Sequence, residues 1–264
     1  MPRVPTADGC RLQAEIEGNG EAVMLISGLS GRADFWNPVR PRLARRYRVI
    51  TFDQRGLGSS ERSAAPCTIG LMASDVLAVL DHFGVDRAHI VGHSTGGTVA
   101  QTLAIDHPSR VGRLVLSGTW ARPDYRFRLL FNTRLSVLQR AGPEAYHALG
   151  QLLTYPPSWI NVNEAAISAK LTAADGMANE PIDIVAERIS MLLAFDRLAD
   201  LRKIATRTLV ISAVDDAMVP FSHAQQLARE ISGARLMETE GGHFFPSIEP
   251  ESFASAVEEF LGQA

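Results

Sequence analysis

The chain has 264 residues, of which 46% are hydrophobic and 21% are charged, and its net charge at pH 7 is -3. This composition is typical of a folded globular protein and excludes a fibrous or disordered chain. The charge balance gives no basic face for nucleic acid, so a small molecule is the expected partner. No apolar run approaches the roughly 18 residues of a membrane span, and the first residues lack the apolar core of a signal peptide. We therefore expect no membrane contact and a cytoplasmic location.

The first predicted element, residues 10–18, alternates apolar and polar side chains like an antiparallel edge strand. Short apolar runs then alternate with helical patterns along most of the chain. The predicted strands are 22–27, 48–53, 89–92, 113–117, 208–212 and 234–239. The predicted helices are 69–84, 98–108, 222–231 and 251–261. This alternation predicts the α/β class, with a mostly parallel sheet covered by helices on both faces.

The interval 119–206 breaks this alternation, because it contains no convincing strand. Helical patterns in segments 125–142, 145–155 and 185–195 predict an inserted helical lid rather than a long loop. Within it, the paired prolines of "YPPSWI" predict a turn, since proline cannot continue a helix. The expected domains are a core of residues 1–118 and 207–264 and a lid of residues 119–206.

The motif "GHSTGG" places Ser94 between a predicted strand and a predicted helix. Serine and glycine also form ordinary turns, so the spacing Gly92-x-Ser94-x-Gly96 is a weak signal by itself. Its position after a strand predicts a nucleophile elbow, a tight turn that exposes the serine hydroxyl.

A serine nucleophile needs a histidine base, and the base needs a carboxylate that fixes its tautomer. "SAVDDAMVP" places Asp216 after one predicted strand, and "EGGHFFP" places His243 after the next. The carboxyl ends of parallel strands lie at one edge of a sheet. Ser94, Asp216 and His243 are therefore the predicted catalytic residues, and the other histidines are expected to be structural or exposed.

The two cysteines, Cys10 and Cys67, are far apart and outside any C-x-x-C spacing. This argues against a disulfide framework and against a zinc site. We expect no metal and no cofactor.

Five segments, "SGLSGRADFW", "FDQRGLGSS", "VGHSTGG", "DDAMVP" and "GGHFF", follow one another along the chain. Together they resemble the lid-bearing esterases and lactonases of the α/β-hydrolase superfamily over nearly the whole length. The resemblance implies the α/β-hydrolase fold and a serine hydrolase that works through an acyl-enzyme. The Val-Pro step that follows the acid in this family favours Asp216 over Asp215.

One departure from the family pattern lies at Ser27 and Gly28, where members often carry His-Gly. The oxyanion hole that the resemblance implies uses backbone groups, so the N–H groups of Leu29 and Thr95 remain the expected donors. The substitution can change how the loop that carries Leu29 is held.

A narrower resemblance, to the aminoacrylate hydrolase group of pyrimidine degradation, is carried by "LISGLSG", "FDQRG", "LLTYPPSWI" and "SAVDDAMVP". Enol-lactonases share this layout without the "YPPSW" segment. Some members of the aminoacrylate group lack the elbow serine, and its presence here favours an acyl-enzyme. The expected function is hydrolysis of a small, carboxylated amide, carbamate or ester-like metabolite. The alternatives are an enol-lactonase, a short-chain carboxylesterase and a non-catalytic ligand-binding protein of the same fold.

The predicted lid begins with the arginine-rich segment "WARPDYRFR". An arginine fork matches a carboxylate through two parallel hydrogen bonds. Four arginines open the lid, and we expect one or two of them to bind a substrate carboxylate: Arg122, Arg126, Arg128 and Arg134. We predict Arg122 as the main substrate contact, with Trp120 and Trp159 in the pocket wall. Solvated charge and core packing are the alternative roles of these residues, and a homodimer is one expected assembly.

Overall fold

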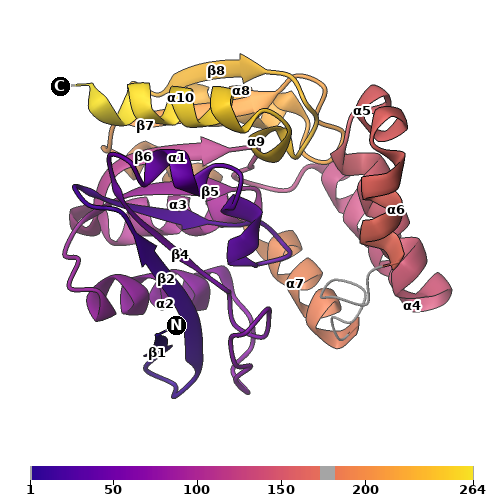
Figure 1. Ribbon diagram of the computed structural model, residues 1–264, viewed down its shortest axis with the longest axis horizontal. Coiled ribbons are helices and arrows are strands. Elements are labelled where there is room, and N and C mark those ends of the chain that lie inside the picture. Colours follow the sequence, from indigo (N-terminus) through magenta and orange to yellow (C-terminus); the bar gives the residue numbers. More distant parts are fainter. Residues whose placement is uncertain (1, 173–181, 264) are drawn as a thin grey trace.

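The computed structural model describes residues 2–172 and 182–263 of the chain, and its centre is a twisted, eight-stranded sheet (Figure 1). The order of strands across the sheet is β1-β2-β4-β3-β5-β6-β7-β8. Strands β3 to β8 are parallel, whereas β1 and β2 are antiparallel to their neighbours. Their bounds are β1 (Arg3–Pro5), β2 (Arg11–Glu17), β3 (Ala22–Ile26), β4 (Arg48–Phe52), β5 (Ala88–His93), β6 (Val111–Ser117), β7 (Thr208–Ala213) and β8 (Arg235–Thr239). The predicted fold class is confirmed.

The prediction of an antiparallel edge strand at residues 10–18 was correct about the antiparallel pairing and wrong about the place at the edge. Strand β2 is antiparallel, but β1 pairs with its outer side and forms the edge of the sheet. Strand β1 has three residues, and only Val4 has a buried side chain. A strand this short shows no alternating pattern in the sequence, so it was not predicted.

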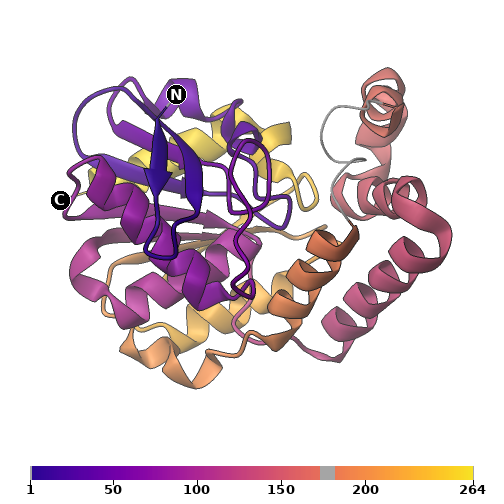
Figure 2. The same ribbon diagram turned by 90° about the horizontal axis from the view of Figure 1, so that it is seen from below.

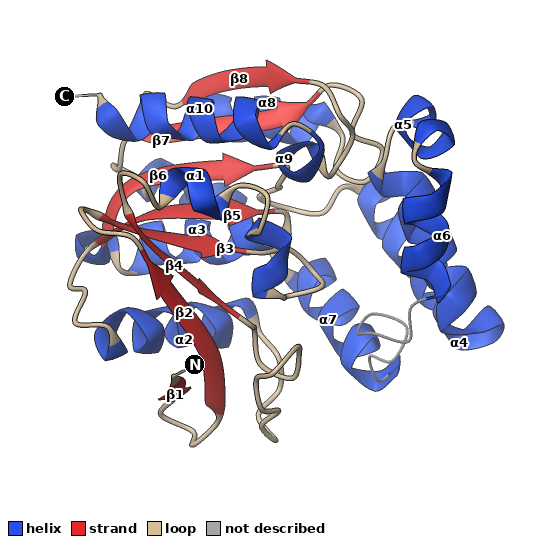
Figure 3. Cartoon of the chain, in the orientation of Figure 1, coloured by secondary structure: helices blue, strands red, loops and turns tan. Residues whose placement is uncertain are grey.

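Helices cover both faces of the sheet (Figure 3). Side chains alternate between the faces along each strand, so in β3 Met24 packs with one core cluster and Val23 with the other. The first cluster includes α2 (Ile69–His82), α3 (Thr95–Asp106) and α8 (Phe221–Glu230), and the second includes α1 (Arg40–Leu43) and α10 (Pro250–Gly262). Short helical turns complete the core: η1 (Ala33–Trp36), η2 (Pro108–Arg110), η3 (Leu198–Lys203) and α9 (Phe245–Ile248).

Between β6 and β7, the chain forms the insertion helices: α4 (Tyr125–Thr154), α5 (Pro157–Val162), α6 (Glu164–Thr172) and α7 (Ile182–Ala194). Figure 2 shows them beside the core. Helix α4 is interrupted at Gly142, whose φ is 87° and which precedes Pro143, and this break separates the two helical segments predicted there. Residues 173–181 of the predicted lid lie outside the described residues, and the domain boundaries stay a prediction.

The prediction of a turn over "YPPSWI" was largely wrong. Only Tyr155 and Pro156 turn the chain, because Pro157 is already the first residue of α5. Proline suits the first position of a helix, where its missing N–H would have no acceptor within the helix. Within the described residues, no helix combines the length and the apolar character needed to cross a membrane.

Candidate active site

Ser94 lies at the junction of β5 and α3, in a backbone conformation that side chains rarely adopt. Its φ is 54° and its ψ is -121°, and among the described residues it is the only non-glycine residue with positive φ. The Ser94 N–H donates to the carbonyl of Ser117 on the neighbouring strand, at 2.8 Å. Strain of this kind persists only where the surroundings impose it, and it is concentrated at functional sites.

The glycines on either side of Ser94 are required by close backbone packing. A Cβ on Gly92 would lie 2.3 Å from the carbonyl oxygen of Gly96, and a Cβ on Gly96 would lie 2.2 Å from that of Ile26. Neither separation is tolerated between atoms that are not bonded. The Gly-x-Ser-x-Gly spacing therefore lets strand, turn and helix come together beneath the serine.

His243 and Asp216 complete a hydrogen-bonded chain with the serine. The His243 Nε2 atom lies 3.0 Å from Ser94 Oγ, and its Nδ1 atom lies 2.7 Å from Asp216 Oδ2. All three residues are buried. The other carboxylate oxygen of Asp216 accepts the N–H groups of Met218 and Val219, both at 2.8 Å, which fixes the orientation of the carboxylate.

Asp215 holds a different part of the site. Its Oδ1 atom accepts the N–H groups of Gly241 and Gly242, at 3.1 and 3.0 Å, and thus ties the loop after β7 to the loop that carries His243. The insertion also contacts this loop, because the Phe244 N–H donates to the Thr154 carbonyl at the end of α4. Both contacts restrict where the His243 ring can lie.

His93, the residue before the serine, packs beside His243, with the two ring centroids 4.9 Å apart. Its ring also stacks on Phe35, and its Nδ1 atom lies 3.0 Å from Ser117 Oγ. Burial, reinforced by the neighbouring His243, holds the pKa of His93 well below its ordinary value of 6.5. His93 is therefore a neutral packing residue at physiological pH.

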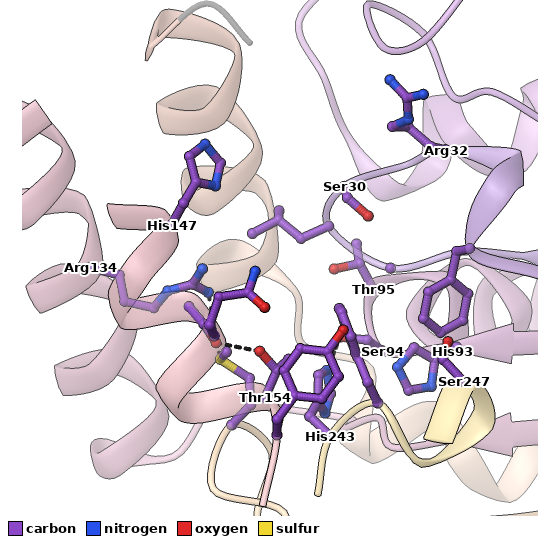
Figure 4. A pocket seen from close by; sticks show the side chains of 18 of the residues that line it. Ser30, Arg32, His93, Ser94, Thr95, Arg134, His147, Thr154, His243 and Ser247 are labelled. Atoms are coloured by element: carbon purple, nitrogen blue, oxygen red, sulfur yellow. Dashed lines mark hydrogen bonds between the residues drawn. The ribbon is translucent and has the colours of Figure 1, made fainter. Parts of the chain in front are cut away.

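A cavity of about 520 Å³ opens above the serine, between the core and the insertion helices. Cavities of this size hold small molecules. Figure 4 shows Ser94 and Thr95 facing Arg134 and His147, which come from helix α4 on the opposite wall. The site lies where the parallel strands end at their carboxyl termini, as expected for an open parallel sheet.

The two predicted oxyanion-hole residues both line this cavity. Thr95 is the first residue of α3, where a backbone N–H has no acceptor within the helix. Leu29 belongs to a loop that passes close to the serine, since a Cβ on Gly28 would lie 3.1 Å from the Ser94 Cβ.

Of the three predicted substrate contacts, the structure brings only Trp159 to the cavity, where it stacks on Tyr155 with 4.3 Å between ring centroids. Arg122 was predicted wrongly, because its side chain is exposed and outside the cavity lining. Trp120 was also predicted wrongly, because it is fully buried in the core beside Phe127.

The arginine that faces the cavity from α4 is Arg134, which is 7% exposed. Its guanidinium lies 4.6 Å from the ring centre of Tyr146 and 5.3 Å from that of Phe131, and Nη1 lies 3.5 Å from the Met218 sulfur. Within the described part of the chain, no carboxylate forms an ion pair with it, and burial lowers its pKa. A sequence signal was present, because Arg134 interrupts the buried stripe of Phe127, Phe131 and Leu138.

Another arginine in the cavity lining, Arg188 on α7, was not predicted from the sequence, whereas Arg134 was one of the four lid arginines named there. It is 2% exposed and lies in the middle of an amphipathic helix, on the face that packs against the core. Among residues 2–172 and 182–263, no group of three or more His, Cys, Asp or Glu side chains is arranged to hold a metal ion.

The sequence model of the alpha/beta hydrolase fold family matches residues 21–250, and the chain belongs to this family. A curated relative from Caulobacter vibrioides, named "Putative carbamate hydrolase RutD", is 39% identical, with 98% of this chain and 97% of the relative covered. A relative of the same name from Azorhizobium caulinodans is also 39% identical, over 96% and 95% of the two chains.

Solved structures give the same assignment. A hydrolase from Pseudomonas aeruginosa superposes with a TM-score of 0.89 at 29% identity, covering 99% of this chain and 98% of the other. An enol-lactonase from Burkholderia xenovorans superposes with a TM-score of 0.90 at 25% identity, over 99% and 100% of the two chains. The resemblances found in the sequence, to the aminoacrylate hydrolase group and to the enol-lactonases, are confirmed, and the chain is a hydrolase by family.

Proposed function

We propose that the protein is a serine hydrolase that cleaves a small, carboxylated carbamate, amide or ester through an acyl-enzyme on Ser94. The observation that carries this proposal is the chain of hydrogen bonds from Ser94 Oγ through the His243 ring to Asp216, beneath a cavity of small-molecule size. A ligand-binding protein would not need this chain, whereas acyl transfer requires it.

In the first step, Ser94 Oγ attacks the carbonyl carbon of the substrate while His243 Nε2 takes the hydroxyl proton. Asp216 holds the ring with Nδ1–H toward its carboxylate, so that Nε2 is free to accept. The N–H groups of Leu29 and Thr95 donate to the oxyanion of the tetrahedral intermediate. Protonated His243 then gives its proton to the leaving group. A water molecule releases the acyl group by the same steps.

The carbamate in this proposal rests on the relatives named RutD, which are called carbamate hydrolases. The carboxylate rests on Arg134, a buried cation at the cavity wall that has no acidic partner among the described side chains. Arg32, also in the cavity lining, already pairs with Asp34 at 2.8 Å. A buried charge without a counter-ion is costly, and a substrate carboxylate would supply the missing negative charge.

A second candidate is the hydrolysis of an enol-lactone, which is favoured by the similarity to the enol-lactonase structure. Both candidates use the same acyl-enzyme chemistry. They are separated by comparing kcat/KM for a carboxylated carbamate, the matching amide and an enol-lactone.

The proposal is tested by treating the protein with a fluorophosphonate and measuring its intact mass. We expect one adduct on the wild type and none on Ser94→Ala. Ser30→Ala is the matched control, because Ser30 also lines the cavity and its loss should leave labelling unchanged. Labelling that persists in Ser94→Ala, or an unlabelled wild type, would overturn the proposal.

A further inference from the structure

Three consecutive peptide groups beside the serine are each held through their carbonyl oxygen. The Ser27 carbonyl accepts the side-chain amide of Gln54 at 2.9 Å, and the Gly28 carbonyl accepts the N–H of Gly31 at 3.0 Å. The Leu29 carbonyl accepts Arg188 Nε at 2.8 Å. The segment is thus fixed at every peptide along the edge of the cavity.

The orientation of the Leu29 N–H follows from these contacts. In a trans peptide the C=O and N–H groups point in opposite directions, so fixing the Gly28 carbonyl also fixes the Leu29 N–H. The peptides on both sides of it are held by Gln54 and Arg188. A rotation of this peptide, which would change the direction of the Leu29 N–H, would have to break at least one of these contacts.

The contacts of Gln54 and Arg188 form one unit. Arg188 Nη2 donates to Gln54 Oε1, and the opposite end of the same amide donates to Ser27. The backbone N–H of Gln54 donates to the Gly31 carbonyl at 2.7 Å, at the other end of the loop. Both side chains are nearly fully buried, which strengthens the hydrogen bonds and fixes their geometry.

We propose that Arg188 is a positioning residue that, together with Gln54, holds the Leu29 N–H toward Ser94 and makes a complete oxyanion hole depend on helix α7. This inference rests on the proposed function, because it assigns a role within the same acyl transfer. Arg188 comes from the insertion, so a displacement of α7 from the core would release the loop.

Two other roles would leave different kinetic signatures. An arginine that binds the substrate carboxylate affects KM for charged substrates and leaves neutral esters unaffected. An arginine that only stabilises the fold changes the amount of folded protein and leaves the turnover per active site unaffected. A residue that positions an oxyanion donor lowers kcat for charged and neutral substrates alike.

The test compares Arg188→Met, Arg188→Lys and Gln54→Met with the wild type, using neutral p-nitrophenyl acetate and a carboxylated ester. Rates are divided by the active-site concentration from fluorophosphonate titration. Gln54→Met and Arg188→Lys keep the test valid if Arg188→Met does not fold. Arg62→Met is the matched control, because Arg62 also joins the core to α7, through Asp183 and Glu187, without touching residues 27–29.

We expect Arg188→Met and Gln54→Met to lower kcat by about 10- to 100-fold on both esters, with KM changed by less than about threefold. The affinity for phenylboronic acid, which forms a tetrahedral adduct on the serine, should fall by a similar factor. Arg188→Lys should recover part of the loss, and Arg62→Met should behave like the wild type.

An unchanged kcat in Arg188→Lys and Gln54→Met, or an effect on KM for the carboxylated ester alone, would overturn the proposal. The variant Ser94→Ala distinguishes a failure of the proposed function from a failure of the positioning role. If Ser94→Ala kept wild-type turnover, both would be wrong. If Ser94→Ala is inactive while the Arg188 and Gln54 variants keep their kcat, only the positioning role is wrong.

Discussion

Asp215 and Asp216 are consecutive in the chain, yet their carboxylates hold different parts of the site. Asp216 binds the His243 ring at 2.7 Å, whereas Asp215 accepts the backbone N–H groups of Gly241 and Gly242. The first contact sets the tautomer of the ring, and the second sets the path of the loop that carries it.

This division predicts unequal effects of two isosteric changes. Asp216→Asn places an amide against His243 Nδ1 and favours the wrong tautomer, so we expect kcat to fall by about 10³- to 10⁴-fold. Asp215→Asn keeps an oxygen that accepts the two glycine N–H groups, so we expect a loss below about 10-fold. Steady-state kinetics on p-nitrophenyl acetate measures both. The opposite ranking would move the orienting role to Asp215.

Arg134 is predicted to select for a negative charge on the substrate. Arg134→Met removes a buried donor to a carboxylate, so KM for a carboxylated ester should rise by about 10- to 100-fold. The control is Arg122→Met, since Arg122 is exposed and outside the cavity lining. Equal KM values for the wild type and Arg134→Met on the carboxylated ester would contradict the anionic substrate class.

Much of the site was predictable because its signals are local. Ser94, Asp216 and His243 each follow a parallel strand, and parallel strands bring their carboxyl ends to one edge of the sheet. The substrate contacts were not predictable in this way. Arg122 and Arg134 both belong to an arginine-rich stretch, but Arg122 lies before α4 and is exposed, whereas Arg134 lies on the side of α4 that faces the cavity.

The contacts of Arg188 could not be predicted from the sequence. The sequence raised the question of how the Leu29 loop is held without the histidine, but the answer joins Gln54 to a residue 134 positions away. Pairing across that separation depends on how α7 packs, which no local pattern encodes. The short strand β1 was missed for a different reason, because three residues give no measurable period.

Two glycines in equivalent helix positions test whether the turn at Ser94 needs close backbone packing. Gly96 and Gly70 are each the second residue of a helix, α3 and α2. A Cβ on Gly96 would meet the Ile26 carbonyl, whereas on Gly70 its nearest neighbour would be 4.0 Å away. We expect Gly96→Ala to lower the free energy of unfolding by more than about 2 kcal/mol. Gly70→Ala should be neutral or stabilising by up to about 1 kcal/mol. Equal effects in urea titrations would contradict the packing of the turn.

The buried His93 predicts sensitivity of the fold to acid. Its pKa is depressed by burial in the folded state, so below pH 6.5 the unfolded chain binds a proton that the folded chain does not. Stability from this residue is therefore complete above pH 6.5 and is lost as the pH falls toward the folded-state pKa. The loss from one proton is at most about 1.4 kcal/mol per pH unit.

His93→Gln should make the free energy of unfolding less dependent on pH below 6.5, by up to that slope. The exposed His82 gives the control His82→Gln, which should keep the wild-type dependence. Urea titrations at several pH values measure the slopes. Parallel pH dependence in the wild type and His93→Gln would show that His93 takes up its proton without unfolding.

The most direct test of the account is the turnover of Ser94→Ala, His243→Ala and the double variant. Because Ser94 and His243 act on one proton transfer, each single change should lower kcat by about 10³- to 10⁶-fold, and the double variant should be little slower than either. Losses that multiply in the double variant, or a Ser94→Ala protein that keeps its turnover, would contradict an acyl-enzyme on Ser94.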